Sequence, residues 1–122
     1  GIYSARWAKK NGSFKKAMLN ILKKIKNTRN RKARFVCSLS IRLNKKKIIT
    51  SEGIVSGNIS YKISGSKGFG YDPIFIPNKN KITFGQMNVS KKMKIDHRSI
   101  AFRKLKKKLK LNKFFIWNFV HI

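Results

Sequence analysis

The sequence predicts an α/β domain, because helical and strand periodicities alternate along one chain. Apolar residues recur at helical spacing in residues 14–26 and again from His97 onward. Between these two segments, residues 35–41 alternate apolar with polar or small side chains, which is the pattern of a strand with one buried face. A length of 122 residues with 41% hydrophobic content is enough for one domain with a core.

The first predicted helix covers residues 14–26. Ser13 is a suitable N-cap, and the lysines of this segment fall on the outward face. The apolar stripe is interpreted as core, and it consists of Phe14, Ala17, Met18, Ile21, Leu22 and Ile25.

Three strands are predicted next, as a meander. The first buries the alternating residues Phe35, Cys37, Leu39 and Ile41. After a turn at Asn44 and the lysines that follow it, a second strand passes through Ile48 and Ile49, and a third covers residues 54–61. Gly53 and Gly57 indicate a bulge or a close approach of another segment.

The remaining chain contains a short predicted strand, a closing helix and an apolar tail. The strand runs through Ile74 and Ile76 and ends at Pro77. The helix starts at His97 after Asp96, a good N-cap, and is marked by Ala101, Phe102, Leu105 and Leu109. Residues 111–122 form an atypical apolar tail, for which three readings stay open: an extra buried strand, a partner-binding patch, and, favoured, translated sequence beyond a frameshift.

The charge is extreme, at +28 with a pI near 11.1. Such a charge is typical of nucleic-acid binders and favours nonspecific binding to polyanions. However, lysine, isoleucine and asparagine make up 51 of the 122 residues, as an AT-rich genome would produce, and 24 of the 31 basic residues are lysine. We therefore favour solvated lysine faces over a dedicated nucleic-acid interface.

Membrane insertion and export find no support in the sequence. No apolar run reaches about 20 residues, and no signal-peptide pattern is present. The single cysteine, Cys37, has no partner for an internal disulfide and suits the reducing cytoplasm, where we expect it to be a buried filler.

The most informative segment is Gly68-Phe69-Gly70-Tyr71-Asp72-Pro73-Ile74-Phe75. Its two glycines permit positive φ, so the ring of Phe69 could be turned toward a ligand. Pro73 restricts the residue before it, which aims the Asp72 carboxylate. Taken alone, such a segment is more often a turn whose aromatics cap the core. Lys92 and the dipeptide His97-Arg98 follow, and together these groups suit a flat ligand with polar edges.

A family pattern includes five parts of the sequence: residues 1–8, residues 68–75, Thr83-Phe84-Gly85-Gln86-Met87, Lys92 and the dipeptide His97-Arg98. Together they resemble the inosine triphosphate pyrophosphatase (Ham1-like) family. The resemblance covers residues 1–110 and implies a mixed twisted sheet with flanking helices, the C-terminal portion of a nucleotide pyrophosphatase domain. It further implies hydrolysis of ITP, dITP and XTP to the monophosphate and pyrophosphate, Mg²⁺ as cofactor, a homodimer and a cytoplasmic location.

The resemblance also implies roles for seven residues. Phe69 would stack on the purine and Asp72 would hydrogen-bond the base edge, with Gly70 and Tyr71 completing that wall. His97 and Arg98 would donate to the 6-oxo side of the base, which adenine lacks, and Lys92 would lie along the nucleotide.

The family's acidic metal ligands and its Asp-Ser-Gly motif have no counterpart in these residues. Only Glu52, Asp72 and Asp96 carry carboxylates, too few for a magnesium cluster. We therefore expect the chain to be a fragment that carries base recognition without a catalytic residue, with the Mg²⁺ ligands in a missing N-terminal segment. Two alternatives remain: an inactive nucleotide-binding remnant and a basic nucleic-acid-binding protein.

Two smaller departures from the family pattern concern Gln86 and Asp96. Gln86 stands where glutamate is usual, which puts any ion-pair role of that side chain in doubt. Asp96 stands where serine is usual, and both residues are good helix N-caps.

Overall fold

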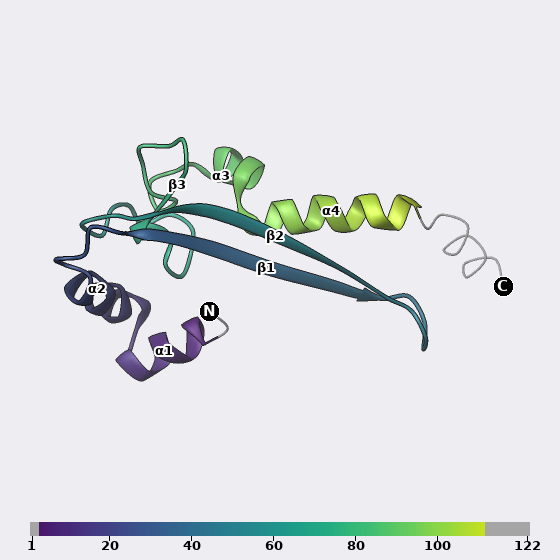
Figure 1. Ribbon diagram of the computed structural model, residues 1–122, viewed down its shortest axis with the longest axis horizontal. Helices are drawn as coiled ribbons and strands as arrows, with labels where there is room; N and C mark the ends of the chain where they lie inside the picture. The colour runs from purple at the N-terminus through teal and green to yellow at the C-terminus, as the bar shows by residue number, and fades with distance from the viewer. Residues whose placement is uncertain (1–2, 112–122) are drawn as a thin grey trace. The chain divides into compact units, whose positions relative to one another are not determined.

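The computed structural model describes residues 3–111 (Figure 1). Its elements follow in the order α1 (Ser4–Asn11), α2 (Phe14–Lys24), β1 (Lys32–Arg42), β2 (Ile48–Ile59), the 3₁₀-helix η1 (Asp72–Ile74), β3 (Phe75–Pro77), α3 (Val89–Ile95) and α4 (His97–Leu111). The predicted α/β class is confirmed. The predicted tail at residues 111–122 lies almost entirely outside the described residues.

The chain forms two compact units. The first comprises the described residues up to Arg34 together with Val55–Lys92, and the second comprises Phe35–Ile54 together with the described residues from Met93. The long strands β1 and β2 each contribute to both units.

Within residues 3–111, the sheet has three strands in the order β1-β2-β3. β1 and β2 form a long hairpin (Figure 1), closed where Leu43 N donates to Lys47 O at 2.9 Å. β3 pairs antiparallel with β2, with Asn58 opposite Ile76. The prediction of separate strands at Ile48–Ile49 and at 54–61 was wrong, because β2 runs unbroken from Ile48 to Ile59 and the third strand is β3. The short strand ending at Pro77 is confirmed.

Gly53 and Gly57 let other backbone approach β2, which is one of the two expected readings. A Cβ on Gly53 would lie 1.9 Å from His97 O, and a Cβ on Gly57 would lie 2.2 Å from Ile76 O. Any side chain at either position would therefore push a neighbouring segment away from the strand.

In the first unit, α1 and α2 lie side by side (Figure 1). Ser13 caps α2 as predicted, since its hydroxyl accepts from Lys16 N at 3.1 Å. Ala17 and Met18 are buried, and the helix ends at Lys24, two residues earlier than predicted. α1 was not anticipated, because its lysine-rich segment carries only a short apolar stripe.

Arg31 ties together the end of α2 and the end of β2. Its guanidinium donates to the carbonyl oxygens of Ile25, Ile59 and Ser60 at 3.0, 2.9 and 2.7 Å. The residue is buried, so these three acceptors compensate for the water that the cation has lost.

In the second unit, α4 lies along the part of the β1–β2 hairpin that belongs to this unit (Figure 1). Ser51 Oγ donates to Ala101 O at 2.6 Å, and Ala101 and Leu105 are buried as predicted. Phe102 was predicted to mark the same face but is 55% exposed, because it points away one position past Ala101. Likewise, Ile41 at the far end of β1 is exposed rather than buried. α3 was not anticipated.

Among the described residues, no helix has the length and apolar character needed to span a bilayer.

Candidate functional site

Residues 68–72, the glycine loop, close on themselves through reciprocal hydrogen bonds. Phe69 N donates to Asp72 Oδ2 at 2.9 Å, and Asp72 N donates to Phe69 O at 3.2 Å. Gly68 and Gly70 both have positive φ, 74° and 62°. The loop runs directly into η1, where Pro73 occupies an N-terminal position that needs no amide donor.

Gly68 is required for space as well as for conformation. A Cβ at this position would lie 2.0 Å from Asp72 Oδ2 and 3.2 Å from Lys92 Nζ. At Gly70, by contrast, a Cβ would meet only the Phe14 ring, at an ordinary 3.7 Å. The carboxylate of Asp72 therefore fills the room that the missing side chain of Gly68 leaves.

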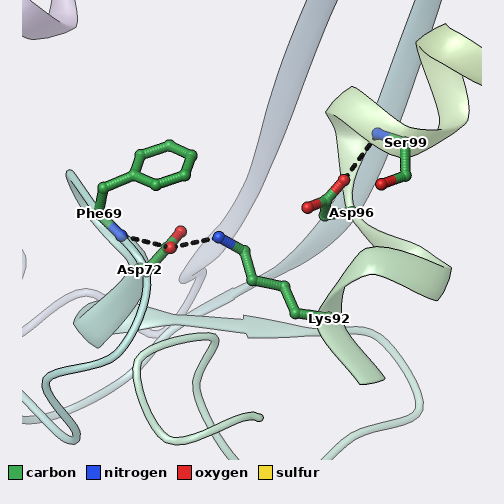
Figure 2. Close-up of polar contacts among 5 residues, drawn as sticks. All are labelled: Phe69, Asp72, Lys92, Asp96 and Ser99. Carbon is green, nitrogen blue, oxygen red and sulfur yellow. Dashed lines mark hydrogen bonds and ion pairs between the residues drawn. The ribbon is translucent and has the colours of Figure 1, made fainter. Parts of the chain in front are cut away.

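The Asp72 carboxylate and the Lys92 ammonium form a buried ion pair with Oδ2 and Nζ 2.5 Å apart (Figure 2). Asp72 is 1% exposed and Lys92 is 6% exposed. Oδ2 thus accepts from both the Phe69 amide and the Lys92 ammonium, so a buried negative charge is matched by one positive charge and one amide dipole. This pair joins the loop to α3, which is 20 positions further along the chain.

The Phe69 ring sits above the ammonium group and remains half exposed. Lys92 Nζ lies 4.3 Å from the centroid of the Phe69 ring and 5.5 Å from that of Phe84, which is buried. A cation against one face of an aromatic ring holds that ring in position. Because Phe69 keeps 49% of its surface exposed, part of the ring is accessible to a ligand.

Tyr71 points toward the N-terminal helices. Its hydroxyl donates to Ser4 O at 2.7 Å, and its ring meets that of Phe14 edge-on at 5.3 Å. Burial disfavours the phenolate and raises the pKa of Tyr71 above its ordinary value of 10.0. The contacts of this side chain anchor the loop on α1 and α2.

The segment Thr83–Met87 braces the loop from the other side. Gly85 N donates to Asp72 O at 3.0 Å, and Gly85 O accepts from Lys67 N at 2.8 Å. Thr83 is buried and its hydroxyl donates to Ser64 O at 2.6 Å, while Gln86 Oε1 accepts from Thr83 N at 3.0 Å. A glutamine carbonyl can make this last bond as a carboxylate would, so the local role of Gln86 needs no charge.

His97 and Arg98 open α4 in the second unit. Asp96 caps this helix as predicted, with its Oδ1 accepting from Ser99 N at 2.7 Å (Figure 2). The His97 ring packs against Phe35 at 5.1 Å, and Arg98 is exposed.

Of the seven residues predicted to bind substrate, the structure brings Phe69, Asp72 and Lys92 into direct contact, with Gly70 and Tyr71 on the same loop. His97 and Arg98 belong to the other unit. The sequence indicated conformational freedom at Gly68 but no role for Thr83 or Gly85, although all three lie in the motif segments. The sequence showed that these three residues belong to the motif, but it did not show the contacts that explain why they are there.

Mg²⁺ does not fit the residues that the structure describes. No group of three histidine, cysteine or carboxylate side chains is close enough there to hold a metal ion. The reason is visible in the two buried carboxylates, since Asp72 is paired with Lys92 and Asp96 caps α4. The described residues therefore supply no metal site for a hydrolytic step.

The sequence matches a known protein family over most of its length. The model of the Ham1 family matches residues 1–108. The chain belongs to the Ham1 family. Its glycine loop, the Thr83–Met87 brace, Lys92 and the start of α4 all lie within the matched region.

Curated members of the Ham1 family with similar sequences are named dITP/XTP pyrophosphatase. The one from Clostridium tetani is 40% identical over 110 residues, which is 90% of this chain and 55% of the relative. The one from Dictyoglomus thermophilum is 48% identical over 111 residues, 87% of this chain and 53% of the relative. The chain thus spans about half the length of the curated relatives it matches.

Solved structures agree with the assignment. The Ham1 protein of Staphylococcus aureus superposes with a TM-score of 0.83 at 39% identity, covering 90% of this chain and 57% of that one. A HAM1 protein from Coxiella burnetii gives a TM-score of 0.82 at 28% identity, covering 90% and 58% respectively.

Proposed function

We propose that this chain supplies the base-recognition part of a nucleoside triphosphate pyrophosphatase, which hydrolyses dITP, XTP and ITP to the monophosphate and pyrophosphate. The observation that carries the proposal is the half-exposed ring of Phe69, held on a glycine loop by the buried Asp72–Lys92 pair, in a member of a family whose similar curated relatives are named dITP/XTP pyrophosphatase. No residue of this chain is assigned a catalytic role.

In this proposal Phe69 stacks on the purine, which supplies affinity at roughly 1–3 kcal/mol per stacked base without choosing among bases. The choice falls to His97 and Arg98, whose donors suit the 6-oxo group of a deaminated purine and leave the amino group of adenine poorly paired. Gly70 and Tyr71 complete the wall on the side of the loop.

Asp72 and Lys92 each have two roles. Their buried ion pair keeps the loop in shape. In addition, Asp72 hydrogen-bonds the polar edge of the base, and Lys92 lies along the nucleotide. A ligand that reached Asp72 would meet a carboxylate with one oxygen already used by two donors, so it would be left with the other oxygen.

The deciding experiment measures pyrophosphate release from dITP, XTP and ITP, with dATP as the reference, by the complete gene product that contains this chain. We expect a clear preference for the three deaminated nucleotides, in the presence of Mg²⁺ held by residues outside the described part. Binding of dITP without pyrophosphate release would identify an inactive nucleotide-binding protein instead, and equal rates with dATP would remove the proposed base selection.

Phe69→Ala and Arg98→Ala test the site itself. We expect each to raise the Michaelis constant for dITP, Phe69→Ala by about 5- to 150-fold if the stacking free energy is lost. Arg98→Ala should in addition reduce the ratio of kcat/KM for dITP to kcat/KM for dATP. Phe69→Ala should instead lower kcat/KM for both nucleotides by a similar factor. Unchanged kinetics in both variants would disprove the assignment.

A homodimer and a cytoplasmic location belong to the same proposal. Both rest on the family to which the chain belongs, and sedimentation of the complete gene product tests the first directly.

A further inference from the structure

A hollow on the sheet of the first unit lies apart from the glycine loop. Its volume is about 460 Å³, and its walls include Lys32 and Arg34 from β1, Ser56 and Asn58 from β2, and Asn78 just after β3. None of these residues is among the seven to which the proposed function gives a role.

The strand pattern explains why these side chains meet. Lys32 and Arg34 occupy exposed positions of β1, and Ser56 and Asn58 occupy exposed positions of β2, while the alternate positions Val55 and Gly57 are buried. Asn78 is held at the third wall because its backbone N–H donates to Ser56 O at 2.9 Å. The hollow is thus built on paired strands, which fix the backbone positions that carry its side chains.

The chemistry of the walls is that of an anion site. Two cations and two side-chain amides line the hollow, and no carboxylate does. Among the residues that the structure describes, the side chains of Lys32, Arg34 and Asn58 have no hydrogen-bond or ion-pair partner. Their donors are therefore available to a ligand, and a planar guanidinium beside an ammonium suits phosphate oxygens.

We propose that this hollow binds phosphate groups, either of a free polyphosphate or of the backbone of a nucleic acid. Its volume lies within the range of about 300–1,000 Å³ that is typical of ligand sites, so it accommodates more than one phosphate group. This site goes beyond the proposed function, since it needs neither the glycine loop nor nucleotide hydrolysis.

The test follows backbone amide chemical shifts by NMR while inorganic tripolyphosphate is added to the protein at low ionic strength. We expect the amides of Ser56, Gly57, Asn58 and Asn78 to shift in a saturable manner. The double variant Lys32→Gln/Arg34→Gln should weaken binding at these amides at least about tenfold. Shifts spread evenly over the lysine-rich surface, or confined to the glycine loop, would overturn the proposal.

A matched control removes the same charge elsewhere in the unit. Lys9→Gln/Lys10→Gln changes two exposed lysines of α1 and should weaken binding by no more than about twofold. Equal losses in the two double variants would show that net charge alone attracts the ligand, which would also overturn the proposal. A second variant, Asn58→Asp, places a carboxylate in the hollow without changing its size and should weaken binding as well.

Two ligands distinguish the source of the phosphate. Tripolyphosphate is compared with a ten-nucleotide oligothymidine in the same titration. Tighter binding of the oligonucleotide, with a salt dependence that becomes less steep in Lys32→Gln/Arg34→Gln, identifies a nucleic-acid backbone, and tighter binding of tripolyphosphate identifies a free polyphosphate. Because the readout is binding at named amides, the result is independent of whether dITP is hydrolysed.

Discussion

Asp72 and Asp96 are both buried carboxylates near the start of a helix, yet they stabilise different things. Asp96 accepts from Ser99 N, three positions along, and fixes only the first turn of α4. Asp72 accepts from Phe69 N, also three positions away, and in addition from Lys92, 20 positions away. The first carboxylate is a local cap, whereas the second joins a loop to a distant helix. The loop that carries the proposed stacking ring is therefore fixed by a tertiary contact, whereas the cap bond of Asp96 is made within three residues of the chain.

The largest expected effect is that of Asp72→Ala. It leaves the Lys92 ammonium buried without its partner, which costs about 3–5 kcal/mol in the free energy of unfolding. Urea denaturation measures the loss. The double variant Asp72→Asn/Lys92→Met removes both charges and should recover part of it; a loss for Asp72→Ala no larger than that for Asp96→Ala would abolish the contrast between the two carboxylates.

Gly68→Ala should be the next most costly change. Its positive φ costs about 1–2 kcal/mol for a residue with a Cβ, and the Cβ would also displace the Asp72 carboxylate. Gly70→Ala is the matched control, because it has the same backbone strain but open space for the methyl group. If thermal denaturation gave equal losses of stability for the two variants, the close packing of Asp72 against Gly68 would contribute nothing to the free energy of unfolding.

Asp96→Ala should cost about 1 kcal/mol, the usual value of an N-cap side chain. Asp96→Ser keeps an acceptor at the same position and should restore most of the loss. Chemical denaturation of the three proteins checks this, and a failure of serine to substitute would show that the charge of Asp96, rather than its cap bond, matters.

Tyr71→Phe is expected to have the smallest effect, about 0.5 kcal/mol at pH 8, because the lost bond to Ser4 O is exposed. The raised pKa of Tyr71 means that the folded state holds the phenol proton more tightly than the unfolded state. The stabilisation by Tyr71 is therefore fully present below pH 10 and declines as the pH rises through the folded pKa. The difference in unfolding free energy between the two proteins, measured from pH 8 to pH 11, should shrink above pH 10; a constant difference would contradict the burial of the phenol.

Local patterns predicted several features correctly. Ser13 and Asp96 were recognised as caps because the donor that each satisfies lies three residues along the chain. The hairpin and the short strand ending at Pro77 followed from alternation and turn residues. The continuity of β2 through Gly53 was missed, since a glycine in a strand looks like an interruption until the backbone of α4 is known to lie against it.

By itself, then, the sequence determined the α/β class, the caps, the family motif and the identity of the groups on the glycine loop, because these depend on residues within a few positions of one another. Tertiary structure alone decided that Lys92 neutralises Asp72, that Gly68 makes room for that carboxylate, and that Lys32, Arg34 and Asn58 line one hollow. Each of these contacts joins segments far apart in the chain, and which partner a buried charge or an exposed strand face meets is set by packing rather than by local propensity.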